Sequence, residues 1–417
     1  MEQEHFNSSL VNDQITRCEV CGHDELKEIL NLGEQPLCDD LVPIGSDLST
    51  PRFPIEILFC QVCRTAHQRF QVPKRRLFPS TYHYRARYTK DVVNGMRELV
   101  QSCEEHLGDI RNLKVLDIGC NDGTLLGIFK EKGCEVFGVE PTDAADDARF
   151  IANVINDYFD IKIAENVKQQ IGIPDIITFT NVFAHIEDLK SLLRALEILI
   201  GNETTIVIEN HYLGSILDRN QFDTFYHEHP RSYSAKSFYY IARALRSQLT
   251  HLEFPGRYGG NIRVFISKKG IPLTDEQIVA DREILIGRQV FNLQNNYRLW
   301  RDKTHEALTE AINKYGPLPS KAFPGRASIL INALNLNEKQ ISVVYEKPGS
   351  LKVNHYLPGT RIPIRSDKDL MQKIGTTNVL VNWAWHISDE IETYLYNLGF
   401  RGSLIDIMPF YNEHVIK

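Results

Sequence analysis

Short apolar runs alternate with helical segments through the middle of this chain, and this alternation constrains its fold more than any other feature. The runs occupy residues 114–118, 135–140, 175–179 and 204–209. Strands that are joined by helices run parallel, and the helices then cover both faces of the sheet. A further strand at 259–265 closes the arrangement. The sequence therefore predicts an α/β, Rossmann-like domain over residues 81–268.

The same alternation returns towards the carboxyl end. Strands are expected at 341–345, 378–382 and 404–407, after a long polar helical stretch from about 274 to 315. A chain of 417 residues is also longer than one hydrophobic core normally accommodates. We therefore predict a second α/β domain over residues 269–417.

The amino-terminal part, residues 1–80, shows little sustained periodicity but holds two Cys-x-x-Cys pairs. The four cysteines are Cys18, Cys21, Cys60 and Cys63. Two such pairs complete a tetrahedron around Zn²⁺, and four thiolates leave no open position, so the site is expected to be structural. An iron site or chance spacing are the alternatives, while a disulfide framework is disfavoured without a secretion signal. His67 is either a spare ligand or a surface histidine.

A glycine-rich turn follows the strand at 114–118 and leads into a helix. It carries Asp117, Gly119, Asn121 and Asp122. Such a turn allows a ligand to approach the backbone closely. Two carboxylates beside it would repel a pyrophosphate, but they suit the sulfonium and amino group of S-adenosylmethionine. The sequence therefore predicts a cofactor site for S-adenosylmethionine at this turn.

Further residues extend this predicted cofactor site. Glu140 ends the second strand, where a carboxylate can bind ribose hydroxyl groups. Asp157, Tyr158 and Phe159 follow at a distance that suits an adenine pocket. The structural alternative is a doubly wound domain that has lost its ligand.

A dense group of polar residues follows the fourth strand. Asp223 and the run Tyr226, His227, Glu228 and His229 gather titratable side chains within a few positions. His185 follows the third strand, and Glu209–His211 ends the fourth. These are carboxyl ends of parallel strands, where ligands bind in open α/β sheets. We interpret the group as the lining of an active site, although a lone histidine would more often be structural.

Charge and hydropathy exclude several classes of protein. The net charge is −7, from 47 basic and 54 acidic residues, which argues against a nucleic-acid partner. One basic patch stands out: Lys74, Arg75, Arg76, Arg85 and Arg87. It is either a solvated surface or a contact for a substrate diphosphate. No apolar run is long enough to span a membrane, and no secretory signal precedes the domains, so we expect a cytoplasmic protein without a membrane partner.

These motifs together resemble one known family, the S-adenosylmethionine-dependent sugar C-methyltransferases that build branched-chain deoxysugars, including nucleotide-sugar C-3 methyltransferases. Besides the paired cysteines, the resemblance rests on Leu32–Leu37, Leu116–Leu126, Gly138–Pro141, Asn181–His185 and Tyr226–His229. It covers nearly the whole chain. It implies a zinc module, a central cofactor domain and a carboxyl-terminal α/β domain, with a nucleotide-linked keto-sugar as substrate.

The resemblance also implies roles for individual residues. His229 matches the proposed general base, Tyr226 and Glu228 its active-site neighbours, and His185 the histidine after the third strand. Either Tyr82 or Tyr84 matches an active-site tyrosine. Asn181, which begins a shared motif, is expected to contact the cofactor.

Three positions depart from the family pattern. Tyr258 precedes Gly259-Gly260-Asn261 where His-Gly-Gly-Ser is expected, Arg326 stands where Lys is common, and Ala86 stands where Ser is expected. These departures suggest a different sugar or nucleotide.

The implied reaction is removal of a proton next to a ketone, followed by methylation of that carbon. Histidine is a suitable base near neutral pH, and a phenol or a second imidazole can stabilise the enolate oxygen. The alternatives are an RNA or protein methyltransferase whose zinc module binds the polymer, and a non-catalytic protein that binds nucleotide sugars. We expect a monomer or a weak dimer.

Overall fold

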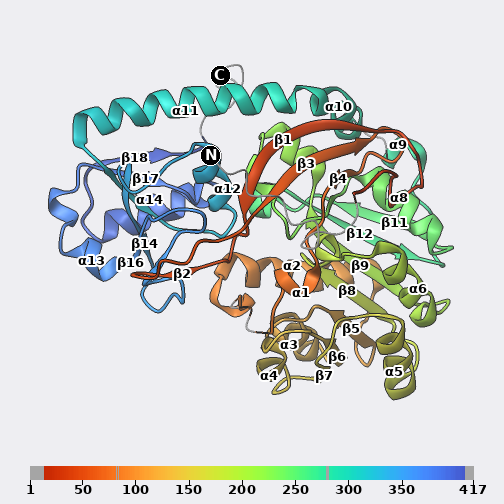
Figure 1. Ribbon diagram of the computed structural model, residues 1–417. Coiled ribbons are helices and arrows are strands. Elements are labelled where there is room, and N and C mark those ends of the chain that lie inside the picture. The colour runs from red at the N-terminus through yellow and green to blue at the C-terminus, as the bar shows by residue number, and fades with distance from the viewer. Residues whose placement is uncertain (1–13, 81, 83, 279–280, 409–417) are drawn as a thin grey trace. The chain divides into compact units, whose positions relative to one another are not determined.

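The computed structural model describes residues 14–80, 82, 84–278 and 281–408 (Figure 1). The chain divides into two compact units, each built from several segments. The first unit comprises Met1–Lys27, Leu58–Ile216 and Glu228–Arg288. The second comprises Glu28–Ile57, Leu217–His227 and Gln289–Lys417.

The first unit is organised around a seven-stranded sheet with the order β11-β12-β9-β8-β5-β6-β7. Its strands are β5 (Lys114–Ile118), β6 (Glu135–Val139), β7 (Asn153–Ile155), β8 (Ile176–Thr180), β9 (Thr205–His211), β11 (Gln248–Glu253) and β12 (Asn261–Ser267). The five strands from β7 to β9 pair in parallel. The last two are antiparallel, β12 to β9 and β11 to β12. The expected Rossmann-like α/β domain is confirmed.

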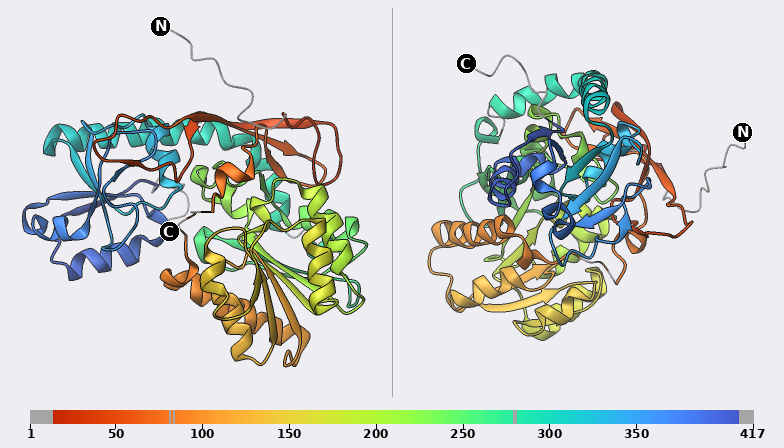
Figure 2. Two further views of the ribbon diagram at one scale, coloured as in Figure 1. Left: turned by 60° about the horizontal axis from the view of Figure 1, so that its bottom comes forward. Right: turned by 90° about the vertical axis from the view of Figure 1, so that its left-hand side faces the viewer.

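Helices cover both faces of this sheet, as the left view in Figure 2 shows. The helices that lie or begin in this unit are α2 (Lys90–Leu107), α3 (Thr124–Glu131), α4 (Ala144–Ala148), α5 (Ile161–Ile171), α6 (Leu189–Leu199), α7 (Leu213–Asp218), α8 (Ala235–Ala244), α9 (Asp275–Ile278) and α10 (Asp281–Gln289). The side chain of Asp160 caps α5, and that of Asp188 caps α6. In α2 the predicted apolar face, which includes Val92 and Leu99, is buried in the core.

The strand order determines where a ligand site can lie. Successive strands run outwards from β5 to β7, and the chain then returns to place β8 on the other side of β5. In open α/β sheets the crevice at such a reversal, beside the carboxyl ends of the strands, is the usual ligand site. The carboxyl ends of β5, β8 and β9 therefore border the expected ligand site.

The cysteine-bearing segments complete the first unit. Strand β4 (Ala66–Gln68) follows the second cysteine pair and forms an antiparallel pair with β10 (Arg231–Ser232). The short helix α1 (Lys74–Leu77) and the 3₁₀ turn η2 (Ala86–Tyr88) lead from there to α2. The amino-terminal segment is thus joined by a strand pair to residues that lie more than 150 positions later in the chain.

The second unit contains a five-stranded parallel sheet with the order β16-β14-β13-β17-β18. Its strands are β13 (Leu318–Lys321), β14 (Ile341–Glu346), β16 (Ile364–Ser366), β17 (Val379–Asn382) and β18 (Ser403–Asp406). The helices are α11 (Leu293–Tyr315), α12 (Ala327–Ala333), α13 (Asp367–Met371) and α14 (Ser388–Asn397). Figure 1 shows α11 as the longest helix of this unit. The predicted carboxyl-terminal α/β fold is confirmed.

Two sequence expectations differ from the structure. The stretch 274–315 is divided into α9, α10, the 3₁₀ turn η6 (Val290–Asn292) and α11. The amino-terminal part also holds two long strands, β1 (Leu26–Pro36) and β3 (Arg52–Cys60), besides β2 (Val42–Pro43), which pairs with β15 (His355–Tyr356). In β3 nearly every residue is buried, so the alternation that identifies a half-exposed strand is absent.

Across the described part of the chain, the helices are all too short or too polar to cross a membrane.

Candidate active site

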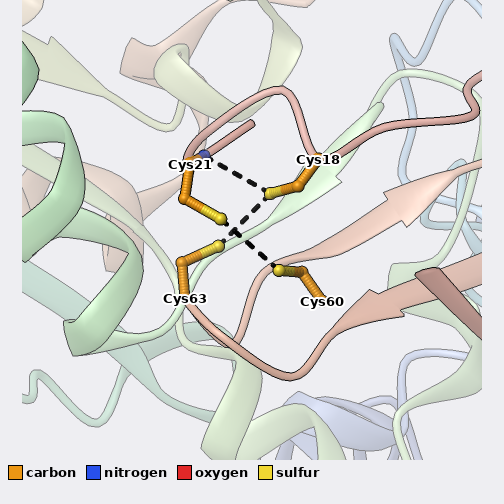
Figure 3. A group of neighbouring side chains, drawn as sticks. All are labelled: Cys18, Cys21, Cys60 and Cys63. Carbon is orange, nitrogen blue, oxygen red and sulfur yellow. Dashed lines mark hydrogen bonds between the residues drawn. The ribbon is translucent and has the colours of Figure 1, made fainter. Parts of the chain in front are cut away.

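The four cysteines of the two Cys-x-x-Cys pairs converge on one point (Figure 3), and we call them the cysteine cluster. The Sγ atoms of Cys18 and Cys63 lie 3.3 Å apart, and those of Cys21 and Cys60 lie 3.6 Å apart. A tetrahedral Zn²⁺ with Zn–S bonds of about 2.3 Å requires sulfur atoms about 3.8 Å apart. The cluster therefore fits a closed zinc site that all four thiolates would hold.

His67 lies against the cysteine cluster rather than at the surface. Its side chain is fully buried, with Nε2 3.3 Å from Cys18 Sγ and Nδ1 3.5 Å from Glu19 Oε2. The interpretation of His67 as a surface histidine is therefore wrong. The four ligand atoms that converge are those of the cysteines, and an imidazole held by a carboxylate beside one of them orients the ligand sulfur.

Arg231 connects the cysteine cluster to the loop that follows His185 in the first unit. Its buried guanidinium donates to Glu19 Oε2 at 2.6 Å and to the carbonyl oxygens of Ile186 and Glu187. Burial alone would raise the pKa of Glu19, but Arg231 and His67 lower it to about 2. The carboxylate is therefore ionised near neutral pH, and the ion pair fixes the loop that follows His185.

The glycine-rich turn after β5 has the backbone that the sequence predicts for a close ligand approach. Gly119 and Asn121 have positive φ angles of 72° and 49°. A Cβ atom on Gly119 would lie 2.6 Å from the side chain of Val182, so a larger residue does not fit. The turn thus packs directly against the loop that leads from β8 to His185.

Two carboxylates organise this turn. Glu140 Oε2 accepts a hydrogen bond from the backbone N–H of Asn121 at 2.9 Å, and its Oε1 accepts from the N–H and hydroxyl of Thr142. Asp122 accepts from the N–H and hydroxyl of Thr124 at the start of α3, and from the N–H of Arg87. These bonds fix the positions of the predicted cofactor-binding carboxylates.

Asp117 is the predicted cofactor residue with the most altered acidity. Burial raises its pKa to about 7, and the charge of Glu140 adds to the rise, while a 2.7 Å hydrogen bond from the Thr178 hydroxyl opposes it. Ionisation of this buried carboxyl group therefore costs free energy unless a cation lies beside it. A positively charged ligand would stabilise the ionised form, which agrees with the chemistry of a sulfonium compound.

Polar atoms at the end of β8 also fit a bound group. The hydroxyl of Thr180 and the Oδ1 atom of Asn181 are buried and have no hydrogen-bond partner among the described residues. Buried polar atoms normally have partners, so these two mark a position where a ligand or water completes the bonding. The residues that are present therefore fit S-adenosylmethionine at this end of the sheet.

The predicted adenine segment lies nearby in the fold, with its side chains partly exposed. Asp157 is exposed, Phe159 is half-buried, and the hydroxyl of Tyr158 donates to the carbonyl oxygen of Phe78 at 2.7 Å. Phe78 in turn stacks on the ring of His185, with centroids 5.1 Å apart. Phe78 thus links this segment to His185.

Three imidazoles meet beyond the carboxyl ends of β8 and β9, and we call them the histidine cluster: His185, His211 and His229. The ring of His229 lies between the other two, with centroid distances of 5.0 Å to His185 and 5.3 Å to His211. Gln68 donates to the carbonyl oxygen of His229 at 3.0 Å. The cluster combines positions that are far apart in sequence, as the predicted active-site lining requires.

A carboxylate and a phenol accompany the cluster. The hydroxyl of Tyr82 donates to Glu228 Oε2 at 3.3 Å, and the Tyr82 ring contacts Phe78 edge-on. Desolvation by its surroundings lowers the pKa of His185 to about 4, so this imidazole is neutral near pH 7. The first unit therefore offers three imidazoles, of which His185 is neutral near pH 7, together with a carboxylate and a phenol in one group.

The remaining predicted site residues have other contacts. The side chain of Tyr84 is 43% exposed, and its carbonyl oxygen accepts from Asn121. Tyr226 and His227 belong to the second unit, where His227 Nε2 contacts the Phe53 carbonyl oxygen at 3.1 Å. Phe78 was not anticipated, because no motif or spacing distinguishes it.

The second unit also holds Asp223, which the sequence placed with the active-site group. Its buried carboxylate is bound by Arg326 Nε at 3.2 Å and by Trp385 Nε1 at 2.9 Å. Arg326 is the position where a lysine is common in the family that the sequence resembles. The side chains of His83 and Tyr258 lie outside the described residues.

Comparison with known proteins agrees with this arrangement. Family models match for a zinc binding domain at residues 18–78, a methyltransferase domain at 83–254 and a C-methyltransferase C-terminal domain at 257–409. The C-methyltransferase NovU of Streptomyces niveus is 26% identical, over 92% of this chain and 94% of its own length.

Two further similarities concern part of the chain. A ubiquinone biosynthesis O-methyltransferase of Acinetobacter baylyi is 31% identical over 23% of this chain and 43% of its own length. A TehB-like methyltransferase structure from Corynebacterium glutamicum, at 18% identity and a TM-score of 0.30, covers 42% of this chain and 88% of its own. The three family models, in contrast, follow one another over nearly the whole sequence. With these three domains in this order, the chain belongs to the family of S-adenosylmethionine-dependent C-methyltransferases.

Proposed function

We propose that the chain methylates a carbon next to the ketone of a nucleotide-linked 4-keto-deoxysugar, at C-3, in the synthesis of a branched sugar. The observation that carries the proposal is the histidine cluster with its Tyr82–Glu228 pair, beside the glycine-rich turn. A carbon next to a ketone becomes a nucleophile only after it loses a proton. A methyltransferase that acts on such a carbon therefore needs a base close to its cofactor.

His229 is the proposed base. Its ring lies between two other imidazoles, and its backbone carbonyl oxygen accepts a hydrogen bond from Gln68, so ring contacts and a backbone bond both hold this residue. An imidazole takes up a proton near neutral pH, which suits general-base catalysis. The C–H bond of the sugar breaks, its proton moves to the imidazole, and the electron pair forms an enolate with the neighbouring carbonyl group.

Hydrogen-bond donors stabilise the enolate in this proposal. The neutral imidazole of His185 can donate a proton to an oxyanion, as can the Tyr82 hydroxyl once it is released from Glu228. Donors that are already aimed at the developing charge lower the barrier. Tyr226 stays a proposed active-site residue because of the motif that contains it. The motif does not distinguish Tyr82 from Tyr84, and the hydrogen bond to Glu228 favours Tyr82.

The cofactor residues hold S-adenosylmethionine, which supplies a methyl group on a positively charged sulfur. Asp117, Asp122 and Asn181 are proposed to face its amino acid part, and Glu140 its ribose. Asp157, Tyr158 and Phe159 are proposed to border the adenine. Gly119 and Asn121 shape the turn that admits it. The sugar carbon would gain the methyl group as the bond between sulfur and methyl breaks, S-adenosylhomocysteine would leave, and the proton would stay on His229 until solvent removes it.

The zinc binding domain has a structural part in this proposal, because its four thiolates leave the metal no open position. We propose the boundaries 1–80, 81–268 and 269–417 for the three domains. The substrate is a small molecule, and neither nucleic acid nor membrane takes part.

The test is methyl transfer from labelled S-adenosylmethionine to a panel of nucleotide-linked sugars with and without a 4-keto group. Product NMR distinguishes a new carbon–carbon bond at C-3 from a methyl ether. The proposal requires turnover of a keto-sugar and none of its reduced 4-hydroxy counterpart. Transfer to RNA, to protein or to a hydroxyl oxygen in the same assay would contradict it.

A further inference from the structure

A second group of metal-ligating side chains lies in the first unit, outside the cysteine cluster. His106 is in the last turn of α2, and His251 and Glu253 are on β11, the edge strand of the seven-stranded sheet. Residues two apart on a strand point to the same face, so both β11 side chains meet the helix. One potential ligand atom from each of the three lies within 4.8 Å of the others.

The contacts within this group are close. His251 Nε2 lies 3.0 Å from Glu253 Oε1, and His106 Nδ1 lies 3.9 Å from the same oxygen. The two imidazole rings have centroids only 3.5 Å apart. Phe265 of β12 packs against both rings and forms the floor of the group.

The surrounding hydrogen bonds determine which atom of His106 could bind a metal ion. His106 Nδ1 lies 2.9 Å from the Ser102 carbonyl oxygen. That oxygen can only accept, so Nδ1 carries the proton and Nε2 keeps a lone pair. Arg263 binds Glu253 Oε2 at 2.7 Å, while the hydroxyl of Ser102 donates to Oε1. The carboxylate is thus fixed in place, and its Oε1 atom faces the imidazoles.

Charge also favours a cation here. Two imidazolium ions would repel each other strongly at this ring distance, so the arrangement favours uncharged rings. Neutral imidazoles are the form that binds metals. The side chains of His106, His251 and Glu253 are 29%, 31% and 25% exposed, so an ion can reach them from solvent.

We propose that His106, His251 and Glu253 bind a divalent transition-metal ion, with Zn²⁺ as the representative, that joins the end of α2 to the edge strand β11. Two imidazole nitrogens and one carboxylate oxygen are a usual zinc ligand set, with water in the fourth position. The ion replaces the proton between His251 and Glu253, so binding releases that proton. Because Arg263 already neutralises part of the carboxylate charge, this site is weaker than the cysteine cluster.

Equilibrium dialysis of the untagged holoprotein against micromolar Zn²⁺, with metal analysis, tests the proposal. We expect a second equivalent of zinc per chain beyond the one in the cysteine cluster, and a rise in Tm of about 2–6 °C. His106→Gln and His251→Gln should each weaken the second equivalent by at least about tenfold. His305→Gln, an exposed histidine in α11, is the matched control and should keep it.

Co²⁺ gives an independent readout that does not depend on activity. At the second site it should show weak d–d bands without the thiolate charge-transfer bands that cysteine ligands produce. Absence of a second equivalent overturns the proposal, as does a second equivalent that both glutamine variants retain. Should either variant fold poorly, far-UV circular dichroism identifies it, and Glu253→Gln replaces it with the same expected loss.

Discussion

The cysteine cluster and the histidine cluster lie in the same unit, yet they are specified in different ways. In the cysteine cluster each half is set by a pair of residues three positions apart, so local geometry already aims two thiols at one point. In the histidine cluster the rings come from the loop after β8, the end of β9 and the loop before β10. Only the strand order brings them together. Local spacing thus specifies a closed metal site, whereas topology specifies the catalytic group.

Arg231 connects these two regions. It is paired with Glu19, next to a cysteine ligand, and donates to the carbonyl oxygens just after His185. The strand pair β4–β10 adds a second connection directly after His229. Variants that act on one cluster, on the other, or on this connection can therefore separate stability from catalysis.

The largest effect is expected for Cys60→Ser. Loss of one thiolate opens the tetrahedral site, and structural zinc contributes about 10–16 kcal/mol to folding in small zinc domains. We expect loss of zinc and of cooperative thermal unfolding, measured by metal analysis and circular dichroism. Cys134→Ser, a buried cysteine outside the cluster, should keep its metal. A zinc-free Cys60→Ser protein with unchanged Tm would contradict a structural zinc site.

The next effect concerns catalysis alone. His229→Ala should reduce kcat by about 10²- to 10⁴-fold, because a general base contributes about that much. Affinity for S-adenosylmethionine and zinc content should stay the same, as isothermal titration and metal analysis would show. His305→Ala is the matched control on an exposed helix. Near-normal turnover of His229→Ala would exclude this residue as the base.

Arg231→Gln should affect both regions. Removal of one partner from a buried ion pair costs about 3–5 kcal/mol, since Glu19 is left without its main counter-charge. We expect a lower Tm, faster zinc loss to a chelator and reduced kcat, with partial rescue by Arg231→Lys. If Arg231→Gln lowered Tm while kcat stayed at the wild-type value below the transition, Arg231 would have no part in positioning the histidine loops.

The acidity of Asp117 predicts a pH dependence of cofactor binding. With a pKa of about 7, this carboxyl group is protonated at lower pH, and a cationic ligand favours its ionised form. Affinity should therefore rise by up to about tenfold between about pH 6 and 8 and then level off. Asp117→Asn should bind weakly at every pH, whereas Asp157→Asn should keep the slope. If the affinity of the wild-type protein for S-adenosylmethionine fell as the pH rises, this prediction would be contradicted.

The free energy of unfolding should depend on pH in the opposite direction to the cofactor affinity. The folded-state pKa of Asp117 lies above its ordinary value of 3.8, so the folded protein binds more protons. Without cofactor, the contribution of Asp117 to the free energy of unfolding should thus decrease as pH rises from about 4 to 7.

The smallest effect separates the two tyrosines. Tyr82→Phe removes the hydrogen bond to Glu228 and should reduce kcat by about three- to tenfold, which corresponds to one hydrogen bond. Tyr84→Phe, whose ring is exposed, should change kcat less than twofold. If steady-state assays showed a larger loss of kcat for Tyr84→Phe than for Tyr82→Phe, Tyr84 would be the active-site tyrosine instead.

Much of the fold could be predicted because its strands are short, apolar and separated by helices. Strand β5 was predicted at its observed bounds, and β6, β8 and β9 within one or two residues. Strand β13 was missed, and Pro319 explains why. Proline lacks an N–H group and is rare in a central strand. The register shift between Leu318 and Pro319 accommodates it, and no local pattern reveals such a shift.

The candidate site could be predicted only in part for a similar reason. His185, His211 and His229 each follow a strand or a motif, so they could be proposed one by one. Their mutual distances depend on the order of β8 and β9 and on the β4–β10 pair. Phe78, which links Tyr158 to His185, has no sequence signal because its contacts are entirely tertiary.

The central claim is that an imidazole of the histidine cluster removes a proton from the sugar carbon. Deuterium exchange tests it most directly, with the keto-sugar incubated in D₂O and the demethylated cofactor S-adenosylhomocysteine, so that methylation cannot follow. We predict that the wild-type protein exchanges the hydrogen next to the ketone and that His229→Ala does not, as NMR of the recovered sugar would show. Equal exchange by both proteins, or none by the wild type on a sugar that it methylates, would contradict the claim.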